Sequence, residues 1–193
     1  MIVSDIKMYF RFFRKVIFLN FLKLFKSLDF TGRIPAEREE LRGYEGCYPV
    51  RGVLSSLLIS ECDSILDIGC GKGLFLYYAR KYPFKRISGI DLCEDWLIVA
   101  QRNVRRIGDK RIDVRLCDAR YFDDYYKYNF FFINNPFCEE IMRIVVSRLV
   151  AYWKRSGKRI TVIYQFPYCR AVFIQSGFVV KDDDGLNVVL TLG

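Results

Sequence analysis

Residues 64–73 read SILDIGCGKG, a short apolar run that ends in three closely spaced glycines. The apolar half predicts a buried strand, because it is bounded by turn-forming residues and too short for a helix. The glycines predict a tight turn, since glycine adopts positive φ angles at little steric cost and lets a ligand approach the backbone. The stretch therefore predicts the first strand–turn–helix unit of an α/β domain, with a binding site at the turn.

Outward from this unit, short apolar runs alternate with amphipathic stretches of helical period. This alternation implies a mainly parallel sheet. The predicted fold is α/β and Rossmann-like: a mainly parallel seven-stranded sheet with helices on both faces and a C-terminal antiparallel hairpin, preceded by N-terminal helices. We expect helices over residues 53–59, 74–81, 94–107 and 139–154, and strands over residues 64–68, 86–91, 112–117, 129–134, 159–165, 178–181 and 186–192.

The composition favours one compact domain with a substantial core, since 52% of the 193 residues are apolar and 17% are aromatic. We divide the chain into a basic amphipathic helical segment (1–30), a connector with a lead-in helix (31–60) and the α/β domain (61–193). The absence of histidine excludes catalytic triads that depend on imidazole. The seven cysteines lack C-x-x-C spacing, so we expect reduced thiols, no metal site and a cytoplasmic location.

The first thirty residues combine aromatic and basic side chains. Their longest uncharged run, residues 16–22, is shorter than the roughly 20 residues that span a bilayer. Lys23 and Lys26 depart from the basic side of the helix, which predicts a bend near Asn20. We expect residues 5–28 either to lie on an anionic membrane surface or to pack against the domain or a partner chain. The apolar stripe comprises Phe10, Phe13, Ile17 and Phe21, and the opposite basic side comprises Lys7, Arg11, Arg14 and Lys15.

Acidic side chains follow the predicted strands at the edge where open α/β sheets bind ligands. Asp67 lies two residues before the first glycine, where a carboxylate repels a pyrophosphate but suits a cationic nucleoside. Asp91 ends the next strand, about twenty residues past the turn, where an acidic side chain accepts hydrogen bonds from ribose hydroxyls. Asp118 and Ala119 follow the third strand, which places the aspartate to accept a hydrogen bond from an adenine amino group.

A fourth candidate segment is Asn134-Asn135-Pro136-Phe137, directly after the strand at 129–134. Asn134 is positioned to accept a hydrogen bond from a nucleophilic nitrogen. Phe137 is positioned to stack against a planar substrate or to shield a cation. In the alternative interpretation, the asparagines cap the following helix and Phe137 belongs to the core.

Together these motifs resemble the class I S-adenosylmethionine-dependent methyltransferases over residues 64–166. Residues 134–137 resemble the D/N-P-P-Y/F motif of that family, which often marks nitrogen methylation, although Asn135 replaces the first proline. The Asn-Asn pair is also similar to a motif of the non-SET histone-lysine methyltransferases, and Tyr48-Pro49 resembles a segment of small bacterial methyltransferases. The resemblance implies S-adenosyl-L-methionine as cofactor and a pocket formed by Asp67, Gly69, Gly71, Gly73, Asp91, Asp118 and Ala119.

The acceptor stays open: a protein, an RNA, or a small-molecule nitrogen or oxygen. The net charge of +9 indicates either an anionic macromolecular partner or an ordinary basic protein. If a protonated amine is the acceptor, the candidate bases are Asp118, Tyr48 and Tyr121. Two other functions remain. One is a nicotinamide-dependent oxidoreductase, which Asp67 and the shifted third glycine disfavour; the other is a catalytically silent module that binds membranes or RNA.

Overall fold

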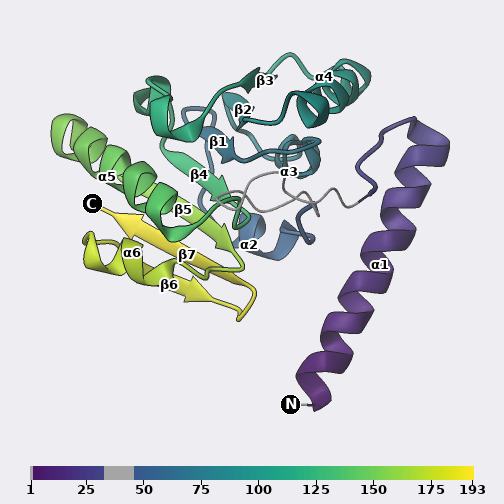
Figure 1. The fold of residues 1–193 in the computed structure, drawn as a ribbon, viewed down its shortest axis with the longest axis horizontal. Coiled ribbons are helices and arrows are strands. Elements are labelled where there is room, and N and C mark those ends of the chain that lie inside the picture. Colours follow the sequence, from purple (N-terminus) through teal and green to yellow (C-terminus); the bar gives the residue numbers. More distant parts are fainter. Residues whose placement is uncertain (1, 33–45) are drawn as a thin grey trace.

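The computed structural model describes residues 2–32 and 46–193, with side chains from Tyr9 onward (Figure 1). Every strand predicted from the sequence is present, with bounds that differ by at most two residues. The strands are β1 (Ser64–Ile68), β2 (Arg86–Asp91), β3 (Ile112–Leu116), β4 (Phe130–Ile133), β5 (Ile160–Gln165), β6 (Val179–Asp183) and β7 (Asn187–Leu192). The helices are α1 (Ile2–Lys26), α2 (Arg51–Ser56), α3 (Leu74–Ala79), α4 (Glu94–Ile107), α5 (Glu139–Ser156) and α6 (Arg170–Gln175), with 3₁₀ turns η1 (Ala119–Tyr121) and η2 (Asp124–Lys127).

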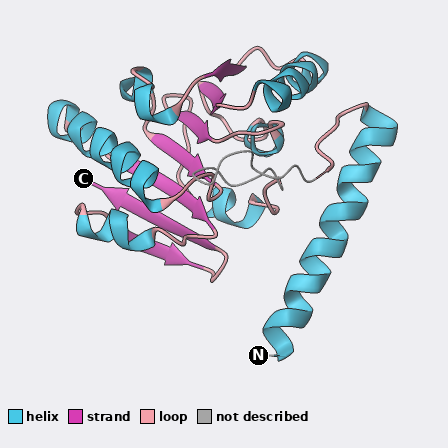
Figure 2. Ribbon diagram, in the orientation of Figure 1, coloured by secondary structure: helices cyan, strands magenta, loops and turns pink. Residues whose placement is uncertain are grey.

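The strands form one seven-stranded sheet in the order β3-β2-β1-β4-β5-β7-β6. The first five strands in this order are parallel, and β7 runs antiparallel to both of its neighbours. Helices cover both faces of the sheet (Figure 2). The α/β class, the mainly parallel sheet and the C-terminal hairpin are thereby confirmed. The strand order reverses between β1 and β4, and ligands of such sheets bind at the carboxyl ends of the strands at this point.

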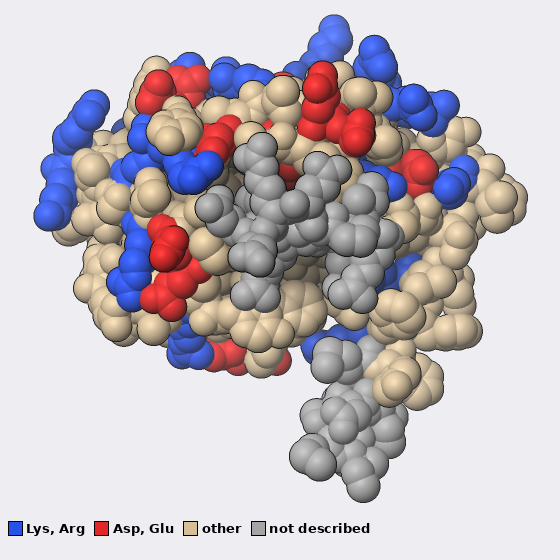
Figure 3. Space-filling view, in the orientation of Figure 1, with Lys and Arg blue, Asp and Glu red and all other residues tan. Residues whose placement is uncertain are grey.

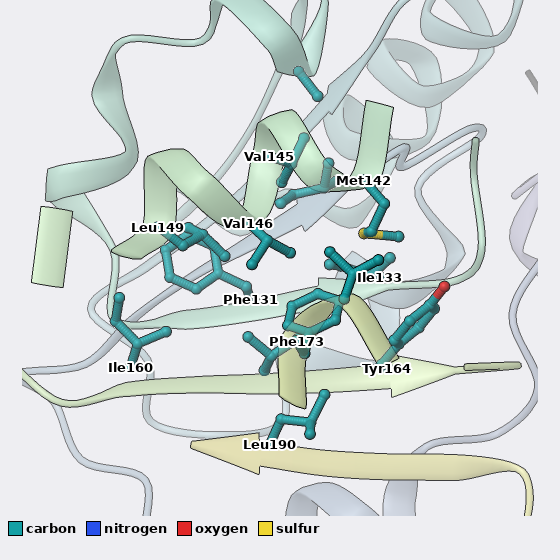
Figure 4. Close-up of a cluster of buried hydrophobic side chains, with 14 of the residues drawn as sticks. Phe131, Ile133, Met142, Val145, Val146, Leu149, Ile160, Tyr164, Phe173 and Leu190 are labelled. Carbon is teal, nitrogen blue, oxygen red and sulfur yellow. The ribbon is translucent and has the colours of Figure 1, made fainter. Parts of the chain in front are cut away.

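Alternate residues of the central strands supply two cores, one on each face. In β4, Phe131 packs with Leu149 of α5 in the first cluster (Figure 4), because successive side chains of a strand point to opposite faces. Phe132 belongs to the second cluster, where its ring stacks on Phe75 of α3 with 3.8 Å between centroids. The uninterrupted apolar run of β4 is thus explained by burial on both sides.

Two short helices differ from the prediction. The lead-in helix α2 ends at Ser56 rather than at residue 59, because Leu57 adopts an extended conformation. The sequence did not predict α6, which lies between Pro167 and Gly177. Its six residues are too few for the helical period to show in the sequence.

The N-terminal helix α1 is continuous, so the predicted bend near Asn20 is wrong. The Asn20 side chain donates along the helix to the carbonyl oxygen of Val16, at 2.9 Å. The helix contacts the domain through a narrow buried side that includes Leu19 and Leu22. Lys15, predicted on the basic side, is also buried there and donates to the carbonyl oxygen of Gly46 at 2.9 Å.

The predicted apolar stripe of α1 does not pack against the domain. Phe10 is 67% exposed and Phe13 is 63% exposed, and Ile17 and Phe21 are also exposed. The expectation that this stripe packs against the domain is therefore wrong. The opposite side of the same helix does pack against the domain. Within the described residues, we find no helix with the combination of length and apolar character that crossing a membrane requires.

Candidate functional site

The glycine turn after β1 is fixed between β2 and the segment that follows β4. The N–H groups of Gly69 and Cys70 both donate to the carbonyl oxygen of Ile90, each at 2.9 Å. Gly69 has a φ of +80°, and a Cβ atom there would lie 2.4 Å from Cβ of Pro136. This position therefore requires glycine for two reasons, its backbone conformation and the close approach of Pro136.

Asp67 lies near the end of β1, beside this turn, and is only 2% exposed. No hydrogen bond or ion pair from the described part of the chain reaches its carboxyl group. Burial raises the pKa of Asp67 well above its usual range, and the negative charge of Asp91 raises the pKa further. A buried carboxylate without a partner is costly, and a neighbouring cation would offset that cost. The position therefore suits the cationic group of a ligand.

Asp91 joins the end of β2 to the glycine turn. Its Oδ2 accepts from the N–H of Gly71 at 2.7 Å, and its Oδ1 accepts from the N–H of Cys93 at 2.9 Å. Burial raises the pKa of Asp91, although these backbone hydrogen bonds lower it. Gly73, the third glycine, is the N-cap of α3 with a φ of +81°. Asp91 thus holds the turn in place, and each oxygen keeps a further lone pair for the predicted contact with ribose.

Asp118 is held by an arginine that the sequence analysis did not single out. Its Oδ2 accepts from Nη2 of Arg120 at 2.7 Å, and its Oδ1 accepts from the backbone N–H of Arg120 at 2.8 Å, which caps η1. Ala119 is 9% exposed, and its carbonyl oxygen accepts from the Tyr125 hydroxyl at 2.8 Å. The contact of Asp118 with an adenine amino group stays a prediction, and it would have to share the carboxylate with Arg120.

The four residues after β4 are placed differently from one another. Asn135 is 8% exposed with a φ of +47°, and the Tyr164 hydroxyl donates to its Oδ1 at 3.5 Å. Asn134 is half-buried. No side-chain hydrogen bond caps α5, so the capping interpretation of the asparagines is not supported. Phe137 is 4% exposed and packs in the core beneath α5, so its position favours a core role over stacking against a substrate.

The two tyrosines proposed as bases occupy contrasting positions. Tyr48 is 7% exposed, and its backbone N–H donates to Oε1 of Gln165 at 2.7 Å. The Lys15 ammonium lies 4.4 Å from the centroid of the Tyr48 ring. Tyr121, in contrast, is 71% exposed. Tyr48 is therefore fixed at the carboxyl end of β5 through Gln165, a fully buried polar residue that the sequence analysis missed although it ends an apolar strand.

The segment after α1, residues 27–32, lies against the glycine turn, and we call it the strap. The Lys72 ammonium donates to the carbonyl oxygen of Thr31 at 2.5 Å. Asn103 of α4 is 1% exposed, and its Oδ1 accepts from the N–H of Asp29 at 2.9 Å. Its Nδ2 donates to the carbonyl oxygens of Asp29 at 2.9 Å and of Lys72 at 3.0 Å. One amide group therefore joins the strap to the turn.

Part of the α/β domain is similar to known methyltransferases. Residues 65–157 match the family model described as "Methyltransferase domain". A probable (S)-tetrahydroprotoberberine N-methyltransferase 2 from Papaver bracteatum is 30% identical over 66 residues, which are 34% of this chain and 18% of that protein. The ribosomal protein L11 methyltransferase of Thermotoga maritima is 35% identical over 48 residues, 25% of this chain and 18% of that protein. The chain thus spans about a fifth of the length of these relatives.

Solved structures share the fold over a longer stretch. A SAM-dependent methyltransferase from Aquifex aeolicus aligns with a TM-score of 0.58 and 18% identity, covering 74% of this chain and 88% of that one. Fibrillarin from Aeropyrum pernix, with natively bound S-adenosyl-L-methionine, aligns with a TM-score of 0.53 and 18% identity, covering 74% and 72%. At these identities the likeness establishes the shared fold. Residues 65–157 thus match a methyltransferase domain, and the chain shares its fold with SAM-dependent methyltransferases.

Proposed function

We propose that this protein transfers the methyl group of S-adenosyl-L-methionine to an acceptor at the carboxyl edge of the sheet. The observation that carries the proposal is the buried carboxyl group of Asp67, which has no partner among the described residues. When bound, the cofactor supplies an activated methyl group on a cationic sulfur, and it also carries an ammonium group. A carboxylate at this point favours such a ligand over the pyrophosphate of a nicotinamide cofactor, because like charges repel.

The residues around the turn divide the binding task. Residues 69–73 offer close approach to the backbone, and Asp67 attracts the cationic end of the cofactor. Asp91 accepts hydrogen bonds from ribose hydroxyls while it holds Gly71, and Asp118 with Ala119 borders the adenine. Methyl transfer needs the acceptor held in line with the breaking bond, so positioning supplies much of the acceleration.

We assign the acceptor contact to Asn134. The amide oxygen of Asn135 already accepts from Tyr164, whereas Asn134 is half-buried at the same edge. An amide oxygen that accepts from an N–H group orients the nitrogen and leaves its lone pair free to react, which favours a nitrogen acceptor. Figure 3 shows Lys and Arg side chains at the margins of the visible face, with Asp and Glu side chains between them. The net charge of +9 favours an anionic macromolecule as the acceptor.

Calorimetric titration with S-adenosyl-L-methionine, and separately with NAD, tests the cofactor assignment. Replacing Asp67 by Asn should weaken cofactor binding by roughly 1–3 kcal/mol, the scale for a lost buried polar interaction. The matched control is Asp95→Asn, which removes the same charge from an exposed position on α4 and should leave the affinity unchanged. Tight binding of NAD without binding of S-adenosyl-L-methionine would support an oxidoreductase instead.

Transfer is tested with methyl-labelled cofactor and extract fractions enriched in protein, RNA or small molecules. We expect label in a macromolecular fraction, and treatment with nuclease or protease identifies its class. Asn134→Ala should lower label incorporation while the dissociation constant for the cofactor stays the same, since Asn134 acts on the acceptor. Cofactor binding without incorporation into any fraction would favour the catalytically silent module.

A further inference from the structure

The helix α1 carries an apolar stripe that nothing in the described part of the chain covers. Its members recur every three or four residues, so they share one side of the helix. Their exposed fractions range from 48% to 78%. A contiguous apolar surface of this kind marks an interaction site in most folded proteins. The stripe comprises Phe10, Phe13, Ile17, Phe21 and Leu24.

The stripe lies on the side of α1 opposite to its contact with the domain. That contact is made by Lys15, Leu19 and Leu22, all of which are buried. At 3.6 residues per turn, the centres of the two sides are about half a turn apart. Figure 1 shows α1 along one side of the molecule, with its N-terminal end extending past the sheet. The stripe is therefore available to a partner while the helix stays attached to the domain.

The charge of α1 favours a lipid surface over a second copy of the helix as the partner of this stripe. From residue 6 to residue 28 the chain contains no acidic residue, and Arg11, Arg14, Lys23 and Lys26 are exposed. Two copies of α1 packed stripe to stripe would bring like charges together, which is unfavourable. Anionic lipid headgroups would neutralise the same charges, and the long basic side chains reach headgroups while the aromatic rings enter the acyl boundary.

We propose that α1 docks in the plane of an anionic lipid bilayer, with the stripe in the membrane interface and the exposed basic side chains of the same helix reaching the headgroups. A helix with an apolar side, a basic polar side and, as in the described part of α1, too little apolar length to span is typical of this mode of binding. The stripe is on the side of α1 that faces away from the domain, so the proposal does not depend on methyl transfer.

Flotation of the full-length protein with lipid vesicles tests the proposal. We expect it to float with vesicles that contain phosphatidylglycerol and not with vesicles of phosphatidylcholine alone. A double change of Phe13 and Ile17 to Ser should reduce binding by roughly tenfold or more, because two buried apolar side chains are lost. Changing Arg11 and Arg14 to Gln should reduce binding by roughly fivefold for each arginine and lower its sensitivity to salt.

The matched control changes Ile98 and Ile174 to Ser, since both side chains are exposed to a similar extent on other helices. This variant should float like the wild type, and circular dichroism should show that all variants are folded. Absence of flotation with anionic vesicles at low salt would overturn the proposal. So would undiminished flotation of the Phe13 and Ile17 variant. Vesicle-independent dimers in sedimentation that disappear with this variant would identify a second copy as the occupant.

Discussion

At the scale of single residues, Asp67 should make the stability of the free protein depend on pH. Its pKa in the folded protein is raised above the ordinary 3.8. Its contribution to the free energy of unfolding is therefore fully present below the unfolded pKa and is lost as pH rises toward the folded pKa. Asp67→Asn removes this dependence, so the variant should gain stability relative to the wild type as pH rises from about 4.

Urea unfolding of both proteins across this pH range measures the difference. The difference between the two curves is needed because other carboxyl groups act in the opposite direction. Asp109 and Asp124, for example, have lowered pKa values because they accept hydrogen bonds from basic side chains. Their contribution to the free energy of unfolding is therefore lost as pH falls. Parallel curves for the wild type and Asp67→Asn would show that Asp67 is not the group responsible.

Gly69 gives a second test at this scale, with Gly108 as its control. Both residues have positive φ angles, +80° and +69°, so alanine at either position costs about 1–2 kcal/mol of backbone strain. At Gly69 the new Cβ also meets Pro136 at 2.4 Å, whereas nothing lies within 4 Å at Gly108. Gly69→Ala should therefore lower the free energy of unfolding, measured in urea, by about 1–3 kcal/mol more than Gly108→Ala does, which is the scale of overpacking. Equal losses in the two variants would mean that Pro136 moves aside freely.

At the scale of elements, the sequence predicted the strands well because each is a short apolar run between turn-forming residues. The sequence also predicted that Asp67 and Asp91 lie at one edge of the sheet, because they come at the ends of β1 and β2 and parallel strands present their carboxyl ends together. The contacts of Asn103 could not be predicted, because its partners in the turn and the strap lie 31 and 74 positions away. An uninterrupted apolar run such as that of β4 predicts burial directly from the sequence. Hydrogen bonds between distant elements, such as those of Asn103, leave no comparable pattern.

The strap provides the prediction at this scale. Asn103→Ala removes three hydrogen bonds and leaves backbone groups of Asp29 and Lys72 without these partners, which should cost about 1–3 kcal/mol. Faster hydrogen exchange at the Asp29 amide should accompany this loss, since its acceptor is removed. Asn20→Ala is the control, because that side chain is exposed and bonds only within α1. An unchanged exchange rate at Asp29 would show that the strap is held by other contacts.

At the scale of the whole molecule, the two cores should unfold together, because the same strands supply both. Phe131 and Phe132 are adjacent in β4 yet belong to opposite clusters, so loss of packing on one face removes support from the other. Leu149 on the first face and Leu76 on the second are both fully buried. Replacing either by Ala should lower the free energy of unfolding by about 2–5 kcal/mol, the scale of a buried cavity.

Circular dichroism and tryptophan fluorescence in urea should then report a single coincident transition for each variant. Leu58→Ala, at a position that is 97% exposed, should change the stability by less than about 0.5 kcal/mol. Only Leu76→Ala should also weaken cofactor binding, because the Leu76 side chain packs beside Gly73 of the glycine turn, 3.5 Å from where a Cβ atom on Gly73 would lie. Two separated transitions would contradict this argument, since they would mean that the faces of the sheet fold independently.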